Sequence, residues 1–220
     1  MVDEKANLMQ RDIEIPVDKG SIKGTLTIPK KARGIIIFAH GSGSSRFSPR
    51  NQYVAKELQR GGFATLLLDL LTDKEEEEDV RTREHRFDIP LLTGRLTAAT
   101  KWCQKDKSAG TLPIGYFGAS TGAAAALSAA AELGDSVKAV VSRGGRPDLA
   151  IDKLAEVVTP TLLIVGGNDY AVIDMNRSAA EYLNVKKEIL IIQGATHLFE
   201  EPGALEKVAQ AAGDWFVTHL

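Results

Sequence analysis

Six short runs of apolar residues alternate along the chain with longer stretches in which apolar positions recur every three or four residues. The runs are 34–39, 63–68, 112–117, 137–141, 161–165 and 188–192. Continuous apolar runs of this length are typical of strands that are buried on both faces of a sheet. We therefore expect each of the six runs to be a strand of one central sheet.

The stretches between these runs have the spacing of amphipathic helices. The expected helices are 50–60, 87–105, 123–133, 176–183 and 204–219. Strands that alternate with helices through short connections predict a mainly parallel sheet, covered on both faces and built from right-handed crossovers. The fold class is therefore α/β, and 220 residues without a linker or repeat predict one domain over residues 1–220.

Two further segments depart from this pattern. Residues 13–17 and 21–28 alternate apolar and polar positions around a turn at 18–20, which predicts an antiparallel, half-solvated pair at the sheet edge. Residues 70–86 form the longest interruption, a charged loop too short to be a cap domain. We expect a sheet-and-helix core whose site is open or lightly covered.

Composition limits the range of partners. The net charge of -2 gives no reason to expect a nucleic acid, and no apolar run approaches the ~20 residues that cross a membrane. Residues 1–11 lack the apolar core of a signal peptide, and one cysteine, Cys103, forms no intrachain disulfide. We expect a cytoplasmic protein in which Cys103 is a packed side chain; oligomeric state is not predicted.

A G-x-S-x-G sequence at residues 118–122 carries the strongest chemical signal. An apolar run precedes it and an alanine-rich helical stretch follows it, which is the strand–turn–helix setting that this motif needs. A serine on so sharp a turn projects its hydroxyl away from the sheet, and the helix that begins there directs free N–H groups at any developing anion. Ser120 is the candidate nucleophile.

An acid and a histidine follow two later strands. Asp169 comes after 161–165 and His197 after 188–192, so both are expected at the carboxyl edge of the sheet with Ser120. His197 would take the proton of Ser120, while Asp169 would hold the imidazole tautomer and stabilise the imidazolium. Asp174 is an alternative to Asp169, which would then cap the next helix.

The oxyanion of a tetrahedral intermediate requires two fixed N–H donors. Thr121, directly after the nucleophile, would supply one, and Ser42, in the turn after 34–39, the other. His40 borders this turn and is expected to orient it by hydrogen bonds. The histidines other than His197, namely His40, His85 and His219, lack metal-like partners at i+4, so we expect no catalytic metal. The expected chemistry implies no cofactor.

Arginines gather in the loops expected at the same edge. Arg46 and Arg50 follow the turn after 34–39, and Arg143 and Arg146 follow 137–141. Arg81, Arg83 and Arg86 lie in the segment 70–86. Arg46, Arg86, Arg143 and Arg146 are the candidates for contact with the substrate. One hypothesis is that some of them bind a carboxylate of the substrate, for which a guanidinium is suited. The alternative is that they pair with residues 75–79 and nearby acids in a solvated or structural network.

The motifs at 40–43, 118–122, 166–169 and 194–197 together resemble the α/β-hydrolase superfamily, and most closely its dienelactone hydrolase branch. The resemblance extends over nearly the whole chain from about residue 24. The best-known members have cysteine as nucleophile, whereas this chain has Ser120.

The resemblance implies an α/β-hydrolase fold without a cap, and hydrolysis of a small ester or lactone through an acyl-Ser120 intermediate. The alternatives are thioester or peptide cleavage, or a non-catalytic binding protein on the same fold.

Overall fold

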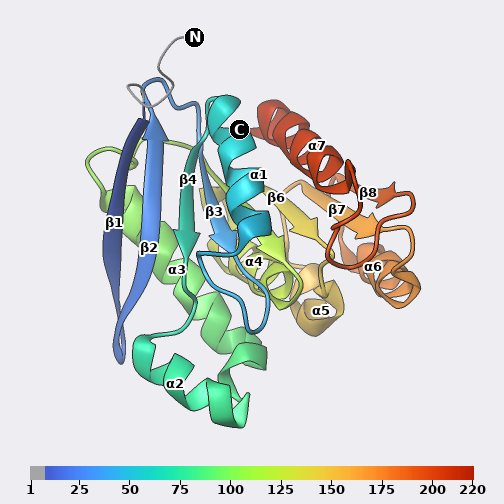
Figure 1. Cartoon of the computed structure of the whole chain (residues 1–220), viewed down its shortest axis with the longest axis horizontal. Helices are drawn as coiled ribbons and strands as arrows, with labels where there is room; N and C mark the ends of the chain where they lie inside the picture. The colour runs from blue at the N-terminus through green and yellow to red at the C-terminus, as the bar shows by residue number, and fades with distance from the viewer. Residues whose placement is uncertain (1–7) are drawn as a thin grey trace.

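An eight-stranded sheet runs through the centre of the computed structural model, which describes residues 8–220 (Figure 1). Its order is β1-β2-β4-β3-β5-β6-β7-β8. The bounds are β1 (Leu8–Val17), β2 (Gly20–Pro29), β3 (Ile35–Ala39), β4 (Ala64–Leu68), β5 (Ile114–Ala119), β6 (Val137–Arg143), β7 (Thr161–Gly166) and β8 (Lys187–Ile192). Strands β3 to β8 run parallel to one another, whereas β2 pairs antiparallel with both β1 and β4. The β1–β2 pair thus forms the antiparallel edge that the sequence predicts.

Burial explains the two kinds of strand. Every residue of β3, β4, β5 and β7 is buried, whereas β1 and β2 alternate between buried and more accessible positions. The chain passes from β3 to β4 on one side and places β5 on the other side of β3. Ligands of open parallel sheets bind at such a switch point, beyond the carboxyl ends of the strands.

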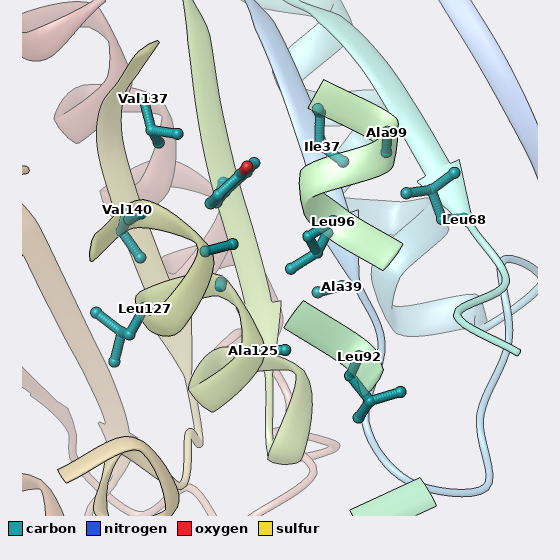
Figure 2. Close-up of a cluster of buried hydrophobic side chains, with 14 of the residues drawn as sticks. Ile37, Ala39, Leu68, Leu92, Leu96, Ala99, Ala125, Leu127, Val137 and Val140 are labelled. Carbon is teal, nitrogen blue, oxygen red and sulfur yellow. The ribbon is translucent and has the colours of Figure 1, made fainter. Parts of the chain in front are cut away.

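Helices cover both faces of the sheet (Figure 1). One face carries α3 (Ile89–Lys105), α4 (Thr121–Leu133) and α6 (Tyr170–Tyr182), and the other carries α1 (Pro49–Arg60) and α7 (Ala204–His219). Figure 2 shows how the small side chain of Ala125 and the larger Leu127 of α4 lie in one cluster with Leu96 of α3 and Val140 of β6. The alanine-rich α4 can therefore approach the sheet closely.

Cys103 belongs to the same cluster. It is fully buried, and burial raises the pKa of its thiol to about 12. This confirms the expected packed side chain. Among residues 8–220, no helix combines the length and the apolar content needed to cross a membrane.

The segment 70–86 is not the loop that we expected. It contains helix α2 (Asp73–Thr82) and a short 3-10 turn, His85–Phe87. The Thr72 hydroxyl accepts from the Glu75 N–H, and the Glu75 carboxylate accepts from the Thr72 N–H, so a complete capping box starts the helix. Acids in the first turn add a favourable interaction with the helix dipole.

Other boundaries differ less. Helix α6 begins at Tyr170 rather than at 176, and a one-turn helix, α5 (Ile151–Leu154), was not expected. Strand β6 continues to Arg143, two residues beyond the predicted 137–141. This last extension matters for the site, because it buries the Arg143 side chain within the edge of the sheet instead of leaving it on a loop.

Candidate active site

Ser120 occupies a strained turn between β5 and α4. Its φ of 50° lies in the left-handed region that non-glycine residues rarely adopt. The Ser120 N–H donates to the Arg143 carbonyl, and the Ser120 carbonyl accepts from the N–H groups of Ala123 and Arg146. Backbone from three directions therefore holds the serine in this conformation.

The glycines of the motif are required by close packing. A Cβ on Gly122 would lie 2.3 Å from the Ala39 carbonyl oxygen, and one on Gly118 would lie 2.5 Å from the Cα of Ala123. Neither distance leaves room for a methyl group. The turn can form only because both positions have no side chain.

His197 and Asp169 lie at the carboxyl ends of the last two strands. The His197 Nδ1 is 2.7 Å from the Asp169 Oδ2, and Asp169, although it precedes α6, makes no side-chain cap to that helix. Asp174 has an 80% exposed side chain directed at Arg177, so Asp169 is the acid that contacts His197.

A cleft of about 250 Å³ brings these groups together, with Ser120 and His197 both in its lining. Within residues 8–220, the hydrogen bonds join His197 to Asp169 but not to Ser120. Gly144 lies close to the imidazole, since a Cβ there would be 3.5 Å from His197 Cε1. Catalytic hydrogen bonds often form only once substrate binds, so the shared cleft, rather than a hydrogen bond, is what connects Ser120 with His197.

The two candidate oxyanion donors are the N–H groups of Ser42 and Thr121. Ser42 is in the loop after β3 and lines the cleft, and Thr121 is the first residue of α4. In the described part of the chain, neither N–H donates in a turn, loop or cap hydrogen bond. The first N–H groups of a helix have no partner within the helix, so the Thr121 N–H is available to a ligand. The Ser42 N–H is available because it makes no such bond in its loop within residues 8–220.

His40 holds the loop after β3 in place. Its Nδ1 is 2.8 Å from the Gly41 carbonyl oxygen, and its Nε2 accepts from the Leu70 N–H at 3.1 Å. Burial lowers the pKa of His40, so the ring is neutral, and these two bonds require the proton on Nδ1. The expected orienting role of His40 agrees with these contacts.

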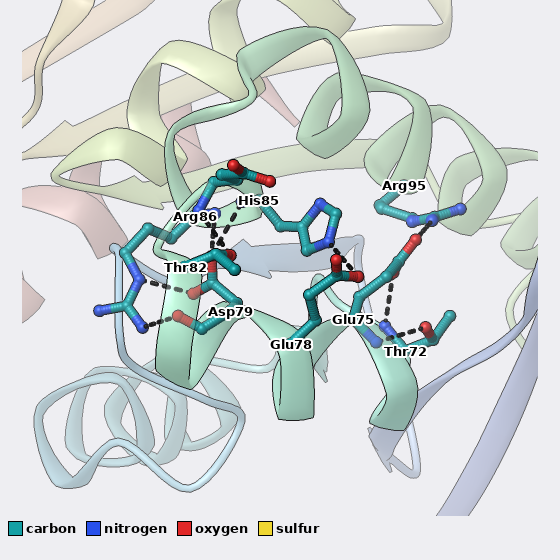
Figure 3. Close-up of polar contacts among 9 residues, drawn as sticks. Thr72, Glu75, Glu78, Asp79, Thr82, His85, Arg86 and Arg95 are labelled. Carbon is teal, nitrogen blue, oxygen red and sulfur yellow. Dashed lines mark hydrogen bonds and ion pairs between the residues drawn. The ribbon is translucent and has the colours of Figure 1, made fainter.

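Three of the four candidate arginines have acid partners. The Arg46 guanidinium pairs with Asp69, that of Arg146 with Asp148 at 2.7 Å, and that of Arg86 with Asp79 at 2.5 Å. Figure 3 shows this last pair and, farther along the same helix, the Arg95–Glu75 pair; both are formed with α2. For these three arginines the structure thus matches the ion-pair alternative.

Arg143 differs from them. It is 7% exposed and lines the cleft beside Ser120, and its Nε and Nη1 have no hydrogen-bond partner among the described residues. Its guanidinium lies over the Phe199 ring, 5.9 Å from the centroid. Burial, with a smaller contribution from the positive charge of Arg50, lowers the pKa of Arg143 to about 10, so it is still cationic at neutral pH.

Ser48 and Asn51 are among the residues of the cleft that the sequence interpretation missed. Ser48 caps α1 and is followed by Pro49 at the first helical position, which is a recognised start signal. That signal predicts where α1 begins; it does not predict that this first turn faces the site.

The chain matches proteins of known family over almost its full length. The family model described as "Dienelactone hydrolase family" matches residues 22–218. A crystal structure of a dienelactone hydrolase from Anabaena variabilis is 56% identical, with a TM-score of 0.95 over 97% of this chain and 99% of that one. An esterase from Pyrococcus furiosus, 16% identical, has a TM-score of 0.73 over 96% of this chain and 93% of its own, which shows the shared fold.

A protein of Mycobacterium tuberculosis, named provisionally as a phosphoribosyl transferase, is 55% identical over 100% of this chain and 49% of its own length. This chain thus spans about half the length of that curated relative. With its fold, its G-x-S-x-G turn and its matched length, the chain belongs to the dienelactone hydrolase family of α/β-hydrolases.

Proposed function

We propose that this chain is a serine hydrolase that cleaves a small ester or lactone through an acyl-Ser120 intermediate. The observation that carries the proposal is the 2.7 Å contact between His197 and Asp169 at the cleft that Ser120 also lines. An imidazole oriented by a carboxylate beside a serine on a strained turn is the arrangement that activates a hydroxyl.

The proposed reaction begins with attack of the Ser120 oxygen on the substrate carbonyl carbon. His197 Nε2 takes the hydroxyl proton, and Asp169 holds the Nδ1 proton and stabilises the imidazolium. The N–H groups of Ser42 and Thr121 bind the oxyanion. The imidazolium then protonates the alcohol, which leaves as the acyl-Ser120 ester forms. In the second half of the reaction, His197 deprotonates a water molecule, which attacks the acyl carbon. The bond to Ser120 breaks, the acid is released, and His197 returns the proton to the Ser120 oxygen.

Arg143 keeps a substrate-binding role in this proposal. As the buried cation of the cleft, it would bind a negatively charged group of the substrate and so orient the carbonyl toward Ser120. We no longer propose such a role for Arg46, Arg86 and Arg146, because each already pairs with an aspartate.

The name of the mycobacterial relative describes a protein about twice as long as the matched segment. It does not say which half carries phosphoribosyl transfer, and the residues at this cleft instead favour acyl transfer. Cleavage of a thioester or a peptide would use the same triad chemistry, so only the rates on different substrates distinguish these activities from ester hydrolysis.

Covalent labelling tests the proposal. A fluorophosphonate should modify Ser120 in the native protein, and Ser120→Ala should abolish the label and lower kcat for a short ester by roughly 10⁴-fold or more, because the members of a triad act as a unit. Rates on matched ester, thioester and amide substrates should be highest for the ester. An unlabelled native protein would instead indicate a binding protein on this fold.

A further inference from the structure

The cleft beside Ser120 has a cationic wall. Two arginines, Arg50 and Arg143, contribute to its lining, and no Asp or Glu does so among the described residues. A pocket whose lining contains two guanidinium groups and no carboxylate favours the binding of anions. The wall therefore selects the charge of what it binds.

Arg143 provides the buried half of this wall. It is 7% exposed, and two of its nitrogens have no partner within residues 8–220. A buried cation without a counter-charge is destabilising, and a buried polar group without a partner is rare enough to require an explanation. An anionic ligand would supply the missing partner.

Arg50 provides the other half. It lies in the first turn of α1, where its Nη1 bonds Glu200 at 2.9 Å while its Nε has no partner among the residues described. The Glu200 side chain is 64% exposed, so solvent screens much of its charge. Arg50 and Arg143 repel each other across the cleft, and an anion placed between them would relieve that repulsion.

Hydroxyl groups complete the donor set. The Ser48 oxygen accepts from the Asn51 N–H at 3.4 Å, so its own proton is free to donate, and the Ser44 hydroxyl also lines the cleft. Two guanidinium groups and two hydroxyls offer more donors, and more positive charge, than one planar carboxylate can use. A tetrahedral dianion has three oxygens and two charges to meet them.

We propose that the cleft contains a phosphate subsite formed by Arg143 and Arg50, and that the preferred substrate is a small ester that bears a phosphate group. This rests on the proposed function for the position of the carbonyl at Ser120. The subsite itself requires only binding, so it can be tested without turnover.

Binding is tested first with inorganic phosphate on the Ser120→Ala protein. Phosphate should raise the thermal unfolding midpoint in a saturable way and should do so at lower concentration than acetate at equal ionic strength. Adding Arg143→Met should remove the phosphate effect, whereas adding Arg177→Ala, which removes an exposed charge on α6, should leave it intact. No saturable effect, or an equal effect in the Arg143→Met protein, would overturn the subsite.

Selectivity is tested with three esters that share one leaving group and differ at the end of the acyl chain: methyl, carboxylate or phosphate. The phosphate ester should have the highest kcat/KM. Its advantage over the methyl ester should fall roughly tenfold or more in Arg143→Met, mainly through KM, and Arg143→Lys should restore part of it. If the carboxylate ester is preferred, the subsite binds carboxylates and the phosphate proposal is wrong.

The two proposals fail in different ways. Phosphate binding that depends on Arg143, without fluorophosphonate labelling of Ser120, would keep the subsite and remove the hydrolase. Labelling and ester turnover without phosphate binding would keep the hydrolase and remove the subsite. Urea unfolding of each variant shows whether the loss of phosphate binding or of ester turnover results from unfolding of the protein.

Discussion

Two arginines in this protein are equally buried and have opposite surroundings. Arg95 of α3 is 6% exposed and Arg143 of β6 is 7% exposed. The Arg95 guanidinium bonds the Glu75 carboxylate of α2 at 2.6 Å (Figure 3), whereas Arg143 faces a cleft without an acid partner among the described residues. Burial alone therefore does not distinguish a structural arginine from a candidate binding residue; the presence of a counter-charge does.

The paired region has an architectural role. Glu75 both closes the capping box of α2 and pairs with Arg95, which ties α2 to α3. Asp79 accepts from the N–H groups of His85 and Arg86 and from the Arg86 guanidinium. Arg86 in turn lies against the loop after β3, since a Cβ on Gly43 would be 3.1 Å from its Nη1. The ion pairs of α2 thus support the loop that carries Ser42.

The largest effect on stability is expected from breaking the Arg95–Glu75 pair. Arg95→Met leaves a buried carboxylate without its partner and should lower the free energy of unfolding by about 3–5 kcal/mol. Urea denaturation measures this. The control is the double variant Arg95→Met with Glu75→Gln, which should recover part of the loss because no charge remains buried. A loss below about 1 kcal/mol would mean that water already screens the pair.

Acid should weaken the same region. Burial acts to raise the pKa values of Glu75 and Asp79, but hydrogen bonds from Thr72 and from Arg86, with the charges of Arg95 and Arg86, hold both below their ordinary values of 4.5 and 3.8. A depressed carboxylate pKa stabilises the fold above the ordinary value, and this stability is lost as pH falls toward the folded pKa.

Asp79→Asn tests this dependence. It should lower the free energy of unfolding near neutral pH by about 1–3 kcal/mol and flatten the part of its decline that begins below pH 3.8, the ordinary pKa of Asp79. Urea unfolding at a series of pH values measures both effects. Glu78→Gln, which changes a half-exposed neighbour on the same helix, is the matched control and should keep the wild-type slope. An unchanged slope in Asp79→Asn would contradict the assignment.

Arg143→Met should act in the opposite direction to Arg95→Met. It removes a buried cation that has no counter-charge, so the free energy of unfolding should stay the same or rise, by up to about 2 kcal/mol, in phosphate-free buffer. In saturating phosphate, by contrast, the wild type should be more stable than Arg143→Met, because only the wild type binds the ligand. A loss comparable with that of Arg95→Met would place Arg143 among the structural arginines.

The sequence predicts the frame of the fold better than the placement of charges. Continuous apolar runs identify β3, β4, β5 and β7, because every side chain of these strands is buried. Helix α2 was missed because its run of acids resembles a solvated loop, although the Thr72-x-x-Glu75 box was present as a signal. Patterns of burial are periodic along the chain, whereas capping depends on one or two residues.

The candidate site divides in the same way. Ser120, Asp169 and His197 can be placed from strand ends and a local motif. The choice between Asp169 and Asp174 needs the direction of two side chains within about one helical turn, which spacing does not provide. The partners of the arginines depend on contacts between distant segments, such as Arg95 with Glu75 and Arg50 with Glu200, so sequence could give only the two alternatives.

The smallest effect is expected from Arg146→Ala, which refines the comparison because Arg146 lies three residues from Arg143 and is paired. Its side chain is 34% exposed and bonds Asp148, and solvent screens much of the attraction between these two charges. The free energy of unfolding should therefore change by less than about 1 kcal/mol. The preference for a phosphate ester over its methyl analogue should persist, since charge near the cleft is not enough without an unpaired guanidinium in its wall. Loss of that preference in Arg146→Ala, at unchanged stability, would show that proximity of positive charge, rather than the missing partner of Arg143, determines what the cleft binds.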